Sequence, residues 1–421
     1  MASFARLAGR AVTGIGVLAL SPVLGLAALA GTAMVGARPV VFTVTGLAVF
    51  ASVFFLGLLL CVPRPRVVWG RWLRALIVLG VEAAVVWQVS AATLRPPPAP
   101  SAPAPVAGQR EWRLPTGSEL AYVRVSPKRV TRPEPVVFLH GGPGVGDLAG
   151  DSALYGRLAA DGFQVYVYDQ LGAGRSARLA DPRGYGLARD VADLEAIRLA
   201  VHAERLNLVA RDQGAQLAAA YLADHPDRVA RAVLSSPAGL SPVRPGVAAL
   251  LTGSGGVPDP RTLAVSTLLQ VDPATAHAFA GEAELSTHLA LLRRRTPPSC
   301  PHSASSGGKG AATTGSVAAR AGAEAVPGGY GGYVALAGRS APAALRRELA
   351  GVSVPVLIVK GACDAQSWSE AAGYRRALPN SRLTYAADAT AQFKALRAFL
   401  TDRPVDGYEG DGPPPGYRGP A

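Results

Sequence analysis

The sequence predicts an α/β fold, in which helices cover both faces of a mostly parallel sheet, preceded by three transmembrane helices. Two observations predict this class. Long apolar stretches fill the first 94 residues, and short apolar runs alternate with helical stretches from about residue 110 onward. We therefore divide the 421 residues into a membrane anchor (1–94), a proline-rich linker (95–109), a globular domain (110–402) and a tail (403–421).

Three apolar stretches form the predicted anchor. Those at about 11–35 and 39–62 are uncharged and long enough to cross about 30 Å of hydrocarbon as helices. The third, at about 73–94, carries Glu82, whose charge must be paired or neutralised at that depth. Arginines gather before the first stretch and between the second and third, which predicts that both segments are cytoplasmic. Three crossings then predict a multi-pass cell-membrane protein, in contact with lipid, with an extracytoplasmic domain.

Composition favours a spacer before the domain and disorder after it. Prolines in the linker favour an extended, semi-rigid chain, and the proline- and glycine-rich tail is typical of disorder. The net charge of +13 comes from scattered arginines rather than from a basic run with interleaved aromatics. We therefore expect no nucleic-acid partner.

Six apolar runs predict the strands of the sheet, and a long insertion follows the fourth run. The insertion, about 240–350, contains low-complexity glycine and serine and is where a cap domain would lie. The predicted strands are 136–139, 163–168, 206–210, 229–235, 354–359 and 382–385.

Three motifs follow successive predicted strands. HGGPG at 140–144 supplies glycines that let backbone N–H groups approach a ligand, as an oxyanion hole requires. DQLGAGRS occupies 169–176, and a strand, a sharp turn and a helix follow at 206–229. In this order the motifs resemble the prolyl iminopeptidase-like branch of the α/β hydrolase superfamily. The resemblance implies an α/β hydrolase fold and an enzyme that hydrolyses small esters, amides or peptides. It also implies that Gly141 and Gly142 belong to the oxyanion loop.

The nucleophile turn departs from the pattern of the family. The resemblance implies GxSxG, but the chain reads Ala-Arg-Asp-Gln-Gly, with Asp212 in place of serine and Gln213 supplying the second oxyanion N–H. Either the nucleophile is lost, or Asp212 attacks carbon as in epoxide hydrolases and haloalkane dehalogenases. Both interpretations stay open at this stage.

Of the two remaining triad residues, the acid is present and the histidine is missing from its expected position. Asp364 follows a late strand and matches the triad acid, whereas Thr390 stands near the position expected for histidine. All six histidines precede residue 303. A histidine of the insertion (His277, His288 or His302) is the remaining candidate for a base.

The three cysteines and the absence of metal motifs complete the sequence-based expectations. Cys300 and Cys363 fall in the extracytoplasmic domain and form either a disulfide or two free thiols. No metal-ligand spacing occurs, so we expect neither a metal nor another cofactor. Three functions remain: a hydrolase of small substrates, an aspartate-nucleophile hydrolase, and a non-catalytic protein that binds a small-molecule or peptide ligand.

Overall fold

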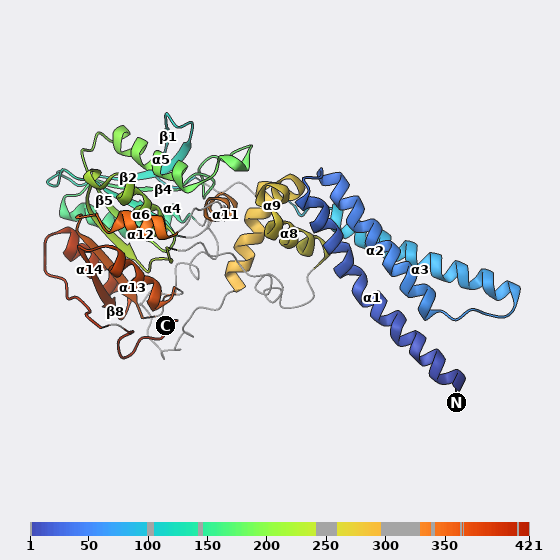
Figure 1. The fold of residues 1–421 in the computed structure, drawn as a ribbon. Coiled ribbons are helices and arrows are strands. Elements are labelled where there is room, and N and C mark those ends of the chain that lie inside the picture. Colours follow the sequence, from blue (N-terminus) through green and yellow to red (C-terminus); the bar gives the residue numbers. More distant parts are fainter. Residues whose placement is uncertain are drawn as a thin grey trace, which may run out of the picture. The chain divides into compact units, whose positions relative to one another are not determined.

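The computed structural model divides the chain into two compact units. One contains Met1–Ala99 and Pro245–His288, and the other contains Pro100–Arg244 and Leu289–Ala421 (Figure 1). The structure describes residues 2–98, 105–141, 146–240, 259–295, 329–337, 342–362, 364, 366–410 and 412–420.

Three long helices make up most of the first unit: α1 (Ala2–Met34), α2 (Pro39–Cys61) and α3 (Val68–Leu94). Each contains a segment long and apolar enough to cross a membrane. Helix α3 begins at Val68, earlier than the apolar stretch, because the arginine-containing turn before it continues the helix. Arg74, at the start of the apolar stretch, donates to the carbonyls of Val62 (3.0 Å) and Leu59 (2.9 Å), which the end of α2 leaves without helical partners.

Glycines bring α1 and α2 into close contact. A Cβ added at Gly25 would lie 3.1 Å from the carbonyl oxygen of Gly46, and one added at Gly46 would lie 3.0 Å from that of Gly25. Farther along the pair, a Cβ at Gly14 would lie 2.9 Å from the backbone nitrogen of Cys61. Small residues at a helix contact allow the backbones to approach, which favours association in lipid through van der Waals packing.

Two helices of the insertion also contribute to this unit: α8 (Pro260–Val271) and most of α9 (Pro273–Arg295), which is kinked at Gly281. Arg261 of α8 pairs with both carboxylate oxygens of Glu284 (2.6 and 2.7 Å) and donates to the carbonyl of Thr93 (2.7 Å). Its buried ion pair therefore joins the two insertion helices to the end of α3. Residues 241–258, 296–328 and 338–341 of the predicted cap lie outside the described residues.

The second unit contains an eight-stranded sheet with the order β1-β2-β4-β3-β5-β6-β7-β8. Strands β1 and β2 and the pair β2–β4 are antiparallel, and all other neighbours are parallel. The six predicted strands correspond to β3–β8, whereas β1 and β2 were not predicted. The strands are β1 (Gln109–Arg113), β2 (Glu119–Val125), β3 (Val136–Leu139), β4 (Val165–Tyr168), β5 (Leu206–Arg211), β6 (Val229–Ser235), β7 (Val356–Gly361) and β8 (Ser381–Ala386).

Helices in two layers bury the sheet. The first and last helices of this unit, α4 (Leu148–Tyr155) and α14 (Ala389–Leu400), pack on one core cluster with the apolar strand residues. The other layer consists of α5 (Leu187–Ala200), α6 (Gly214–Asp224), α12 (Pro342–Leu349) and α13 (Trp368–Ala377), and α11 (Gly329–Ala337) contacts the 3₁₀ helix Pro182–Gly184. Short 3₁₀ helices also occur at Gly156–Asp161 and Pro226–Arg228.

The tail runs along the edge of the sheet without a helix or strand in its described residues. Its composition predicts disorder, yet it makes defined contacts: Tyr408 N donates to Leu383 O (2.6 Å), and Arg418 N donates to Ala362 O (2.9 Å). The tail therefore contacts β8 first and the end of β7 later.

Candidate functional site

A strained turn between β5 and α6 presents Asp212. Its φ of 51° lies in the left-handed region, which aspartate tolerates better than most side chains. The turn is fixed on both sides, because Asp212 N donates to Ser235 O (3.1 Å) and Ala238 N donates to Asp212 O (2.9 Å). The strand, turn and helix predicted at 206–229 are thus present. Gln213 starts the helix with φ −70° and ψ −23°.

Two glycines allow β3 and the turn to meet. A Cβ at Gly214 would lie 2.3 Å from the carbonyl oxygen of Leu139, and one at Gly141 would lie 2.8 Å from the Cβ of Asp212. Only glycine fits such approaches, which bring the backbone after β3 against the candidate nucleophile. The predicted oxyanion residue Gly141 therefore lies beside Asp212. Gly142 lies outside the described residues.

Gln366 contacts the Asp212 carboxylate, although no motif in the sequence predicts this contact. Its side-chain amide donates a hydrogen bond to Asp212 Oδ1. Gln366 lies in the loop between β7 and α13, two positions after Asp364. Only its place beside the predicted triad acid could have suggested this glutamine.

Asp364 is fixed at the end of β7. Its Oδ2 accepts from Gly361 N (2.6 Å) and lies 3.5 Å from Nζ of Lys360. Lys360 is fully buried, and Nζ also donates to the carbonyl of Gln366 (2.5 Å). Burial lowers the pKa of Lys360, and the Asp364 carboxylate opposes that shift. The buried Lys360 therefore contacts both Asp364 and Gln366, the two residues of this loop whose side chains belong to the site.

The connection at the expected histidine position is short. Strand β8 ends at Ala386 and α14 begins at Ala389, with Asp388 capping the helix by accepting from Ala391 N (2.8 Å). Thr390 is exposed in the first helical turn. Gln392 instead reaches inward: a Cβ at Gly361 would lie 2.1 Å from Gln392 Nε2 and 2.7 Å from Asp364 Oδ1.

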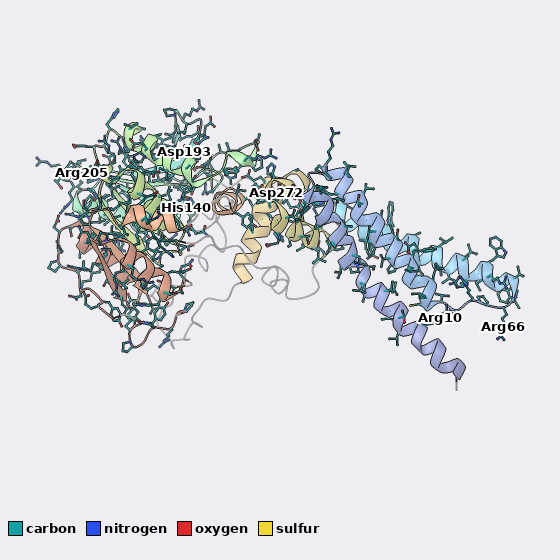
Figure 2. The ribbon with its side chains drawn as sticks, viewed as in Figure 1. Arg10, Arg66, His140, Asp193, Arg205 and Asp272 are labelled. Carbon is teal, nitrogen blue, oxygen red and sulfur yellow. The ribbon has the colours of Figure 1, made fainter. Side chains whose placement is uncertain are left out.

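His140, the first residue of the glycine loop, has a structural role. It is buried after β3 (Figure 2), its Nε2 accepts from Gln170 N (2.9 Å), and its Nδ1 lies 2.9 Å from Gly141 O. These partners assign the proton to Nδ1 and occupy the Nε2 lone pair. His140 therefore joins Gly141 to Gln170 of the second motif, and both ring nitrogens are engaged by these contacts.

The other histidines are distributed over both units. His225 ends α6, where its ring packs 4.9 Å from that of Tyr221, and His202 lies exposed after α5. His277 and His288 lie on α9 in the first unit, where His288 Nε2 is 3.1 Å from Ser266 Oγ. His302 lies outside the described residues.

A buried ion pair supports the turn from behind. Arg211 lies 3.0 Å from Asp151 of α4, and its guanidinium lies 5.4 Å from the ring centroid of Phe138. Burial raises the pKa of Asp151 to about 6, and the arginine opposes this rise. Burial alone would lower the pKa of Arg211, but the Asp151 carboxylate raises it. The arginine that departs from the usual turn sequence thus partners a buried carboxylate.

Asp169 of the second motif is buried, and its carboxylate packs against Gly146 and Gly174. A Cβ at Gly146 would lie 2.0 Å from Asp169 Oδ1, and the carboxylate accepts from Arg175 N (2.8 Å). Burial raises the pKa of Asp169 to about 7, while the backbone hydrogen bond from Arg175 opposes this. The motif therefore forms a tightly packed loop, and its Gln170 contacts His140 after β3.

Neither the predicted disulfide nor a metal site can be placed in the described part of the chain. Cys300 and Cys363 both lie outside it, and Cys61 of α2 is a free thiol. Within the described ranges, no group of three or more histidine, cysteine or acidic residues could hold a metal ion.

The sheet order, the strained turn and the glycine loop define an α/β hydrolase domain. The family model described as alpha/beta hydrolase fold matches residues 134–269. The proline iminopeptidase of Heyndrickxia coagulans is 38% identical over 107 residues, covering 24% of this chain and 35% of the relative. That of Lactobacillus helveticus (strain DPC 4571) is 34% identical over 128 residues, covering 30% of this chain and 43% of the relative.

These matches show an α/β hydrolase fold and confirm the similarity to the proline iminopeptidase-like branch that the motifs predicted. The chain spans less than half the length of either of these two iminopeptidases. Among solved structures, the enol-lactonase from Burkholderia xenovorans LB400 is 20% identical with a TM-score of 0.45, covering 69% of this chain and 100% of that one.

Proposed function

We propose that this chain is a membrane-anchored, non-catalytic α/β hydrolase-fold protein whose site binds a small-molecule or peptide ligand. One observation carries the proposal: the group at the nucleophile position is a carboxylate held by the amide of Gln366. In a working triad, that carboxylate would be a hydroxyl and that amide an imidazole.

Acyl transfer at this site would need a proton acceptor beside position 212, where the described side chain of Gln366 presents an amide. An amide donates and accepts hydrogen bonds but takes no proton near neutral pH. The amide of Gln366 donates to the Asp212 carboxylate, and the amide of Gln392 lies beside Gly361 at the end of β7. Lys360 donates to Gln366 O and pairs with Asp364, so its proton is engaged by acceptors.

The same features suit binding. Backbone N–H groups after β3 and at the start of α6 lie beside a fixed carboxylate, so a ligand with both a hydrogen-bond acceptor and a donor would find partners for each. A peptide carries this combination in every residue. A small amide or amine-bearing molecule is the alternative ligand class.

The strained backbone of Asp212 favours one second candidate, an aspartate-nucleophile hydrolase. Its φ of 51° presents the carboxylate as a nucleophile turn presents its reactive group. In such a mechanism Asp212 would attack an epoxide or alkyl halide carbon, and water activated by a base would then cleave the ester. Without that base the ester should accumulate.

We further propose that the anchor places the hydrolase domain outside the cytoplasm. Arg10 on α1 and Arg66 between α2 and α3 lie toward the same end of the first unit (Figure 2), as expected for a cytoplasmic end. Protease treatment of intact cells should then cleave the hydrolase domain. A domain that remains uncut until the cells are lysed would contradict this orientation.

The test of non-catalysis uses the full-length chain in detergent micelles beside an Asp212→Ala control. Aryl esters, proline arylamides and epoxides are the substrates, and we expect equal background rates for both proteins. Turnover that disappears in Asp212→Ala would overturn the proposal. Intact-mass measurement after incubation with an epoxide separates the second candidate, because a covalent adduct at Asp212 would show attack without release.

A further inference from the structure

The end of the tail forms a compact turn against the candidate site. Pro414, Pro415 and Gly416 lead into Tyr417, whose N–H donates to Pro414 O (3.1 Å), and Gly416 has φ 86°. Proline at the second position and a left-handed glycine at the third are the requirements of a type II turn. The segment is therefore shaped by its own sequence before it meets the domain.

Backbone hydrogen bonds attach this segment to the loop between β7 and α13. Arg418 N donates to Ala362 O (2.9 Å), and Trp368 N donates to Pro420 O (2.9 Å). The second bond satisfies one of the N–H groups that the start of α13 leaves without a helical partner. One bond runs in each direction, as when an extended peptide is held through its main chain.

Tyr417 anchors the segment between the two bonds. Its ring lies 5.4 Å from that of Trp368 and 5.7 Å from Nζ of Lys360, and its hydroxyl lies 3.4 Å from Gln366 O. Trp368 also contacts Tyr408 (5.2 Å between ring centroids), so two tail tyrosines pack on one tryptophan. Burial raises the pKa of Tyr417 to about 12, and Asp364 adds to the rise, so the hydroxyl stays protonated.

Glycine at position 419 permits the closest approach. A Cβ there would lie 2.9 Å from the carbonyl oxygen of Asp364, which is a backbone atom and cannot rotate away. The attached loop is the one that brings Asp364 and Gln366 to the site, and Gln366 binds Asp212. The tail therefore supports the loop whose side chains complete the site.

We propose that the surface made by Ala362, Gln366 and Trp368 is a peptide-binding surface for a Tyr-Arg-Gly-Pro segment, occupied here by the chain's own tail. Release of the tail loosens the loop and exposes Asp212 and Asp364 to solvent. The proposal does not rest on the proposed function, because the tail would control access equally for a ligand or for a substrate.

Carboxyl labelling of the full-length chain tests the control of access. A carbodiimide with glycine ethyl ester modifies accessible carboxylates, and mass spectrometry reports the rate at each aspartate. Gly419→Ala adds a methyl group against Asp364 O, whereas Gly412→Ala adds one where no atom lies within 4 Å. We expect several-fold faster labelling of Asp212 and Asp364 in Gly419→Ala only, with exposed Asp227 as the internal reference. Equal rates in the two variants would overturn the proposal.

A peptide added in trans tests the binding surface itself. The full chain shortened to end at Gly412 lacks the segment, and its helical content by circular dichroism should match that of the parent. A fluorescent peptide with the sequence of residues 413–421 should bind the shortened chain, not the parent, and should restore slow labelling of Asp212. A scrambled peptide should do neither. Absence of binding by the matching peptide would contradict the proposal even if the proposed function holds.

Discussion

The side-chain amide of Gln366 donates a hydrogen bond to Oδ1 of Asp212 across 154 positions of the sequence. A carboxylate thus stands at the nucleophile position, and an amide stands against it. The pair keeps a directed hydrogen bond between the loop after β7 and the turn after β5. It lacks a group that gains or loses a proton during acyl transfer near neutral pH.

We predict that a serine–histidine pair can be introduced at this contact. In Asp212→Ser/Gln366→His, an imidazole replaces the amide that already reaches position 212, so it should act as a base toward the serine hydroxyl. We expect p-nitrophenyl acetate hydrolysis roughly 10²-fold above Asp212→Ser alone, at the lower end of general-base effects. Equal initial rates for the single and double variants would show that position 366 does not present its side chain to the turn.

We predict that breaking the ion pair behind the turn strongly destabilises the fold, and that removing both charges restores most of the stability. Arg211→Met leaves the Asp151 carboxylate buried without its partner, which should cost about 3–5 kcal/mol of unfolding free energy at pH 7. Arg211→Met/Asp151→Leu removes both charges and should recover most of this loss. Denaturant unfolding followed by tryptophan fluorescence measures both, and a double variant no better than the single would contradict the ion-pair explanation.

The raised pKa of Asp169 predicts that the contribution of this residue to folding stability falls as pH rises. Its folded pKa, raised to about 7 from the ordinary 3.8, means that the folded protein binds the proton more tightly than the unfolded chain. The resulting stabilisation is fully present below pH 3.8 and is lost as pH rises through 7. Thermal unfolding of Asp169→Asn should therefore change less between pH 5 and 8 than that of the parent. Parallel pH profiles for the two proteins would argue against a buried, protonated Asp169.

The contact between α1 and α2 predicts different effects for two glycines of one helix. Gly25→Leu places a side chain against the backbone of Gly46, whereas Gly16→Leu places one where no atom lies within 4 Å. We expect Gly25→Leu to destabilise the helix pair by about 1–3 kcal/mol through overpacking, with little change for Gly16→Leu. Melting temperatures in detergent micelles compare them, and equal melting would show that the two helices do not meet at Gly25.

The central strands could be predicted because they are buried on both faces and are therefore apolar throughout, as at 136–139. The two antiparallel strands β1 and β2 escaped prediction because neither shows a strand pattern: Gln109–Arg113 contains only one buried residue, and Glu119–Val125 neither alternates nor is apolar throughout. The position of Asp212 was also predictable, since the strand and helix around the turn have strong local patterns.

The sequence by itself determined the apolar helices, the family of the globular domain, the aspartate at the nucleophile turn and the absence of a histidine after residue 302. Only the tertiary structure decided that Gln366 binds Asp212, that Arg211 pairs with Asp151 and that the tail packs on Trp368. The physical reason is the separation along the sequence of the residues that interact. Apolar periodicity and turn chemistry act between neighbours in the chain, whereas each of these contacts joins distant segments whose meeting depends on how the sheet orders its strands.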